Sequence, residues 1–553
     1  MGRSIDQGLA GVEMRILKRI VPDRHQVGLR RAFMLAIVFF TIVLAISLNR
    51  YFSFYTSYDQ GLFNQLFWNN LHGRWFQSSL TSANSIASLE DGATPIVSFI
   101  HLGQHFVPDF LLWLPLYALF PHPITLIVLQ VGLMTVGGLV LYALARQRLS
   151  EQLSVWITAS YYTAIPVVGS TVANFYEHCQ IPLFTFGTLL ALEKKNWLWF
   201  WICAVLVLGV REDAGIILFG IGVHLMLSRR HPGIGIALCI LSFGYVAFVT
   251  NVIQPQFSSD VSRLYLANRF RQFVDTDQPT TLQVLWGMVT HPLRLAQYLL
   301  LPIDRRINYL AGQWAALALV PAVSGAAWIL SAFPLIAIFA QTGQTALSVT
   351  LRYAVAVVPG VFYGAILWWE RHPHWFTAKF RRWWKVCIVL SLLFMVSGNP
   401  HRAFSFMIPD SVRPWVFVPL PRQWEHASHI YNVIRNVPDN VSVSTTTYLV
   451  PQLSTRRIIV RLPTLEIYDD RRQKVRVDYA IADLWQLKEY SKAFKDSQAY
   501  LARTLPLLEK LVNENQYGVR QVEDGVVMMV QGQPSDPAML AQWQKLVLQL
   551  KQG

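Results

Sequence analysis

The stretch RRAFMLAIVFFTIVLAISLNRYFSFYTSYDQGLFNQLFWNN, residues 30–70, joins a basic pair, a long apolar run and a lone acid. The apolar run from Phe33 to Leu48 follows Arg30 and Arg31 directly. Because Lys and Arg residues stay on the cytoplasmic side of a membrane span, we expect this run to begin inside the cell and to end outside. That orientation places the acid, Asp59, just beyond the outer end of the first span.

The composition of the whole chain is that of a membrane protein. Of its 553 residues, 53% are hydrophobic and 14% are charged, with a mean hydropathy of +0.34, whereas a soluble domain carries about 25% charged residues. Apolar runs on the scale of the roughly 17–25 residues that cross a bilayer recur along the chain. The net charge of +15 does not indicate a nucleic-acid partner, because the basic residues cluster in short segments between apolar runs.

Counting apolar runs onward from the first span predicts a polytopic α-helical membrane protein with roughly 11 transmembrane helices. Residues 1–31 would form a cytoplasmic segment and residues 32–398 the transmembrane domain. Two long external loops are expected, at 49–123 and 254–308. Within the first loop, the proline-rich run 105–123 is expected to lie along the outer membrane surface, because a crossing there would turn every later basic loop outward.

Residues 399–553 are expected to form a small α/β domain, because charges are dispersed there and long apolar runs stop. The count of spans places this domain outside the cell. Clusters of β-branched residues, a helical pattern and a turn signal predict its elements. In chain order these are a strand, a short helix and a strand within 440–460, a strand at 475–483, a helix at 497–515, and a hairpin at 517–532 that turns near Asp524 and Gly525.

Ionisable and polar residues gather at the outward ends of the predicted spans and in the first external loop. Such groups are costly at membrane depth and are therefore functional candidates. We expect residues from distant parts of the chain to converge on one external cavity at membrane level. The candidates are Asp59, His105, Glu177, His178, Arg211, Asp213, Arg352 and Tyr353.

Two of the candidates also have purely structural interpretations. Asp59 could cap a helix that begins at Gln60, since Asp is a favourable residue at that position. Arg211 could pair with Glu212 or Asp213 as a structural clamp. For both residues the sequence alone leaves the choice between a structural and a functional role open.

The remaining candidates are equally ambiguous. Glu177 and His178 could be solvated at the headgroups, and Arg352 could contact lipid phosphates without specificity. His105 lies four residues after His101, a spacing that suits a helical metal pair, but Pro108 interrupts the pattern. The sequence therefore leaves a divalent cation as an open question.

Several motifs together resemble the bacterial membrane-protein family labelled domain of unknown function twenty seventy-nine, over roughly Phe33 to Asp483. That family is similar to the GT-C superfamily of glycosyltransferases, which use polyprenyl-phosphate-linked sugars. At 176–182 the chain reads YEHCQIP, which keeps the His of a Phe-His-Pro-like turn but lacks its proline. The other resembling motifs are YDQGLFNQLFWNNLHG (58–73), HFVPDFLLWLPLYALFPHPITLIVLQ (105–130), REDAG (211–215), RYAVAVVPG (352–360) and VSVSTTTYLVPQLSTRRIIVRLP (441–463).

The resemblance implies a GT-C-like fold and a role for Asp59 as the catalytic carboxylate close to the first span. Asp59 would act as a general base that takes a proton from an unknown acceptor. A single displacement would invert the configuration at the anomeric carbon of the sugar. Arg352 or Arg211 would stabilise the leaving lipid phosphate. The resemblance also implies a bacterial inner-membrane location, with membrane lipids around the site.

Two other classes of protein stay open. A transporter or lipid flippase usually has ionisable residues near the bilayer midplane and internal repeats, neither of which the sequence shows. A noncatalytic membrane scaffold with a working external domain is the third class. Loss or retention of sugar transfer after Asp59→Asn separates these classes from an enzyme.

Overall fold

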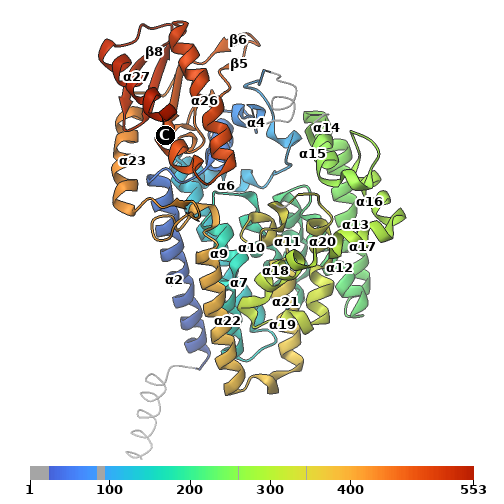
Figure 1. Cartoon of the computed structure of the whole chain (residues 1–553). Coiled ribbons are helices and arrows are strands. Elements are labelled where there is room, and N and C mark those ends of the chain that lie inside the picture. Colours follow the sequence, from blue (N-terminus) through green and yellow to red (C-terminus); the bar gives the residue numbers. More distant parts are fainter. Residues whose placement is uncertain (1–23, 84–93, 259–260, 344, 553) are drawn as a thin grey trace, which may run out of the picture.

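The computed structural model is mostly helical, with a small strand-containing region at one end of a helix bundle (Figure 1). It describes residues 24–83, 94–258, 261–343 and 345–552. Most of the expected cytoplasmic segment 1–31 therefore lies outside the described residues.

Four stretches of helix are long and apolar enough to cross a membrane within the described part of the chain. They are Val27–Phe52, Pro123–Ala145, Pro232–Phe257 and Arg352–Arg371. The first lies in α2 (Arg24–Phe52) and confirms the expected first span. The elements that carry the others are α7 (Pro123–Ala145), α13 (Pro232–Phe248) with η3 (Val249–Ile253) and α14 (Gln254–Phe257), and η7 (Arg352–Ala356) with α21 (Val358–Arg371).

The other predicted spans correspond to shorter or more highly charged helices. The helices α10, α11 and α12 have 13, 14 and 13 residues, or about 20 Å each, whereas the hydrocarbon core is about 30 Å thick. The total of roughly 11 spans therefore stays a prediction. The helices concerned are α8 (Glu151–Thr163), α9 (Ile165–Thr171), α10 (Ile181–Glu193), α11 (Trp197–Val210), α12 (Gly215–Leu227), α18 (Ile303–Trp314), α19 (Val320–Val323), α20 (Gly325–Phe339) and α22 (Ala378–Ser397).

The two expected external loops contain short helices. In the first loop, α6 (Phe110–Leu119) has Pro115 inside it and only 10 residues, which is too short for a span. The segment 254–308, expected as a polar loop, is largely helical because its apolar residues recur at helical spacing and Thr280 forms a capping box with Gln283. The other elements are α3 (Tyr58–Leu71), α4 (Ser79–Ala83), η1 (His101–Gly103), α15 (Val261–Phe270), α16 (Thr281–Thr290) and α17 (Pro292–Leu300).

The C-terminal region is built on a five-stranded sheet in the order β4-β3-β7-β9-β8. Strand β3 pairs in parallel with β4 and β7, whereas β9 pairs antiparallel with β7 and β8. The strand, short helix and strand, the later strand, the helix and the hairpin expected from the sequence are all confirmed. These elements are β3 (Val443–Thr445), α24 (Val450–Leu453), β4 (Ile459–Arg461), β7 (Tyr479–Asp483), α26 (Lys495–Asn513), β8 (Tyr517–Glu523) and β9 (Val526–Gln531).

Further elements complete this region. Two small antiparallel pairs, β1 with β2 and β5 with β6, lie outside the main sheet. The sequence did not predict the first and the last helix of the C-terminal region. The elements are β1 (Ser411–Val412), β2 (Trp415–Val416), α23 (Leu420–Ile434), β5 (Glu466–Tyr468), β6 (Lys474–Arg476), α25 (Leu484–Ser491) and α27 (Pro537–Gln552).

Helix α3 joins the bundle to the C-terminal region. The short helix α24 packs against it, and a side chain at Gly61 would meet Val450 at 2.7 Å. The buried amide of Asn64 donates to Ser454 at 2.9 Å, and that of Gln65 donates to the carbonyl of Arg457 at 3.1 Å. Since buried amides are costly to leave unpaired, these contacts hold α3 in one position.

A buried histidine fastens α23 to the sheet. The Nε2 of His426 lies 3.1 Å from Asp483 Oδ2, its Nδ1 lies 2.7 Å from Asp524 Oδ2, and Arg422 donates to the other oxygen of Asp524 at 2.7 Å. Burial lowers the pKa of His426, but the two carboxylates outweigh it and raise this pKa to about 9. The imidazolium therefore persists well above the ordinary histidine range.

We expect this contact to stabilise the protein fully below pH 6.5 and to be lost as the pH rises through about 9, because the folded state holds the proton more tightly. The loss amounts to about 3 kcal/mol. Melting curves of the full chain between pH 6 and 10 measure this loss of stability. His426→Gln should remove the pH dependence that the wild type shows across this range. The exposed His72→Gln is the control, and a pH profile unchanged in His426→Gln would contradict the assignment.

Candidate functional site

Asp59 lies at the start of α3, immediately beyond the end of α2. The N-cap residue is Ser57, so Asp59 occupies the first turn and does not cap the helix. Its carboxylate accepts a hydrogen bond from the Tyr176 hydroxyl at 2.8 Å and lies 3.9 Å from Nη1 of Arg352. The side chain is 34% exposed, which leaves it accessible to a substrate.

Buried polar contacts fix the start of α3. Gln60, next to Asp59, donates to the carbonyl of Pro123 at 3.0 Å and accepts from the backbone of Phe175 at 2.7 Å. The backbone N–H of Ser57 donates to Asn174 Oδ1 at 3.0 Å. The first turn of α3 is thereby attached to the segment that carries Tyr176.

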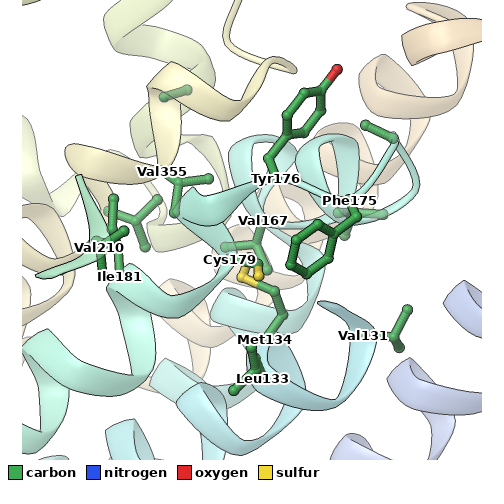
Figure 2. Packing of buried hydrophobic residues seen from close by; sticks show 14 of the residues in the cluster. Val131, Leu133, Met134, Val167, Phe175, Tyr176, Cys179, Ile181, Val210 and Val355 are labelled. Atoms are coloured by element: carbon green, nitrogen blue, oxygen red, sulfur yellow. The ribbon is translucent and has the colours of Figure 1, made fainter. Parts of the chain in front are cut away.

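Tyr176 is the direct partner of Asp59 and was not predicted. Its ring belongs to the buried cluster around Met134 and Val167, and its hydroxyl points away from that cluster (Figure 2). The hydroxyl accepts from Asn174 Nδ2 at 3.1 Å and donates to Asp59. Because both ends of the side chain are held, Tyr176 gives the carboxylate a defined orientation.

Two arginines meet at the hydroxyl of Tyr353, and one of them, Arg352, lies beside Asp59. The guanidinium of Arg352 lies 4.2 Å from the ring centroid of Tyr176, a favourable cation–π distance. Arg352 and Arg269 both donate to the hydroxyl of Tyr353, at 3.1 and 3.2 Å. Arg269 belongs to α15, in the segment 254–308 that was predicted to be a polar loop, and it was therefore missed. Such a pair of cations suits a phosphate group.

Arg211 lies at the centre of a second, buried ion cluster. Its Nη1 is 3.4 Å from Glu177 Oε1 and 3.3 Å from His178 Nε2, and its Nε is 3.2 Å from Glu212 and 3.3 Å from Asp213. Burial raises the pKa of Glu177, but the neighbouring His178 and Arg211 outweigh it and hold this pKa well below its usual range. The structural clamp considered for Arg211 is therefore present.

His105 joins this cluster from the first external loop. Its Nδ1 lies 3.0 Å from Glu212 Oε1, and the backbone N–H of Phe106 donates to Glu212 Oε2 at 2.9 Å. The neighbouring His101 contacts the hydroxyl of Thr81 at 3.0 Å. Across the described residues, no three His, Cys, Asp or Glu side chains are grouped so as to hold a metal ion.

The structure brings all eight candidate residues into one connected region. The ring of His178 meets Tyr353 edge to face, at 5.8 Å between centroids, and so links the Arg211 cluster to the Arg352 side. Two small cavities in this region have volumes of about 10 and 50 Å³, and Asp59 lines neither of them. His178 lines both, because it lies between the two clusters. The single cavity expected around Asp59 therefore stays a prediction.

Comparison with known proteins identifies a family but no curated relative. No curated protein matches the chain. A family model described as "Predicted membrane protein (DUF2079)" matches residues 50–528, which include α3, the candidate residues and most of the C-terminal region. The chain therefore belongs to the membrane-protein family DUF2079.

Proposed function

We propose that this protein is a membrane glycosyltransferase with a GT-C-like fold, acting on the extracytoplasmic side of the bacterial inner membrane. It would move a sugar from a polyprenyl-phosphate-linked donor to an acceptor, with inversion at the anomeric carbon. The observation that carries this proposal is the pairing of a partly exposed carboxylate, Asp59, with the guanidinium of Arg352 at 3.9 Å, beside the end of α2.

In this mechanism Asp59 acts as the general base. An acceptor hydroxyl loses its proton to the carboxylate as its oxygen attacks the anomeric carbon, while the bond to the donor phosphate breaks. Tyr176 orients the carboxylate through its hydrogen bond at 2.8 Å. A buried carboxylate would be held by its protein partners, whereas the exposed part of Asp59 leaves an oxygen edge for the acceptor.

Arg352 and Arg269 are suited to the leaving phosphate. The departing group is an anion, so it needs positive charge more than it needs a proton. Both guanidinium groups already meet at the Tyr353 hydroxyl, and planar guanidinium groups bind phosphate oxygens in pairs. Arg211 is less suited to this role, because its side chain is 2% exposed and surrounded by carboxylates.

The proposal is tested with purified full-length protein in lipid nanodiscs. The substrates are synthetic polyprenyl phosphates that carry radiolabelled hexoses or pentoses, and the measurement is label released from the lipid phase. Asp59→Asn should lower the rate by about 10²–10⁴-fold, because it removes the base but keeps the shape. Arg352→Gln should raise the KM for the donor.

The exposed Asp304→Asn, in the first turn of α18, is the matched control and should keep the wild-type rate. Full activity of Asp59→Asn would refute Asp59 as the base. The transporter or flippase would be favoured if the protein, reconstituted in sealed liposomes, moved a labelled lipid or solute across the membrane without forming any transfer product.

A further inference from the structure

A groove runs along the outside of the bundle between α2, α8 and α22. Helix α8 packs against both α2 and α22 and forms the floor, while α2 and α22 form the walls. The groove has a volume of about 510 Å³. Its lining residues are Arg31, Met34, Leu35, Val155, Trp156, Ala159, Lys385, Ile388 and Val389.

The groove surface is hydrocarbon apart from its two cationic side chains. Met34 on one wall is 65% exposed and Val389 on the other is 54% exposed. Trp156 is half-buried on the floor. Apolar side chains of this kind on a helix long enough to span a bilayer face lipid, so the natural occupant is an acyl chain.

Two cations distinguish this groove from an ordinary lipid-facing surface. Arg31 and Lys385 are both exposed and line it with their side chains. Long basic side chains bury their stems on apolar surface and extend their charges toward the headgroup level. Glu151 packs against Gly28, one turn before Arg31, and within the described residues it forms no ion pair with either cation.

We propose that this groove binds an anionic phospholipid. One acyl chain lies along the apolar walls and floor, and the headgroup phosphate contacts Arg31 and Lys385. The site is independent of the proposed glycosyl transfer, because α2 extends about 30 Å from Arg31 to its end at Phe52, at 1.5 Å per residue. The groove therefore lies at the opposite end of α2 from Asp59 and its donor.

The two cations set the headgroup preference. One basic residue near the membrane surface raises the affinity for an anionic headgroup by a factor of roughly five. Two such residues therefore predict about 30-fold tighter binding of an anionic than of a zwitterionic lipid. The acyl-chain contacts are common to both lipids and do not contribute to this ratio. Retention should weaken at high salt, because the cations are exposed and screened.

The test uses the full chain in detergent micelles, titrated with phosphatidylglycerol or phosphatidylcholine of the same acyl chains. Native mass spectrometry counts the bound lipid. The double variant Arg31→Gln with Lys385→Gln should lose the 30-fold preference and bind both lipids equally. The double variant Lys194→Gln with Lys195→Gln removes the same charge from an exposed turn and should keep the preference.

A third variant separates the headgroup from the groove. Ala159→Phe fills the floor but keeps both cations, and it should lower retention of phosphatidylglycerol at least fivefold. Equal binding of the two lipids by the wild type would overturn the proposal. An equal loss in the Lys194 and Lys195 variant would also overturn it, because general charge would then explain the preference. Matching melting temperatures confirm that each variant is folded.

Discussion

Replacing Arg211 with Met is expected to lower the free energy of unfolding by about 3–5 kcal/mol. The change removes the cation that Glu177 and Glu212 share, and those side chains are only 2% and 10% exposed. An uncompensated buried carboxylate is far more costly than a buried pair. The measurement is the apparent melting temperature, followed by intrinsic tryptophan fluorescence in one detergent.

A second substitution checks that charge is the cause. Arg211→Met combined with Glu177→Gln should recover part of the lost stability, since it removes one of the stranded carboxylates. The exposed Arg382→Met on α22 serves as the control and should melt as the wild type does. Equal melting temperatures for Arg211→Met and Arg382→Met would show that the cluster does not stabilise the fold.

The second large effect is expected at Arg50, in the last turn of α2. Its buried guanidinium donates to the carbonyls of Val172, Tyr55 and His401, at 2.6, 3.0 and 2.8 Å. Lysine keeps the charge, but its compact ammonium lacks the planar fork that reaches all three. With each lost hydrogen bond to a charged donor worth roughly 1.5–3 kcal/mol, Arg50→Lys should destabilise the protein by about 3 kcal/mol or more.

The same fluorescence melting experiment measures this loss. Arg305→Lys on α18 is the matched control, because Arg305 is exposed. If Arg50→Lys melted with the control, positive charge alone would be sufficient at this position, and the three carbonyl contacts would not contribute to stability.

Local sequence patterns predicted the C-terminal region well. The turn at Asp524 and Gly525 and the strand at 479–483 depend on neighbouring residues, so a short window contains the necessary information. The segment 254–308 was less predictable. Its helices are short and bounded by polar residues, and composition alone could not distinguish such helices from a loop.

The sequence predicted the charged residues of the candidate site, but not two of the residues that contact them. Asp59 and Arg352 do lie together, because Asp59 follows one span and Arg352 begins another at the same end of the bundle. Tyr176 and Arg269 were missed. Tyr353 was predicted because it stands beside Arg352 at the start of a span, whereas nothing in the sequence singles out Tyr176. Arg269 reaches the site only through tertiary packing of α15.

The close packing at Gly61 determines how this protein can be divided. Val450 occupies the space where any side chain at position 61 would lie, and the amides of Asn64 and Gln65 find their partners across the same boundary. A chimera that exchanged the region after residue 399 for another domain would strand those amides and open a gap along α3. Bundle and C-terminal region are therefore expected to be stable only together, and exchanging one of them alone should destabilise the protein.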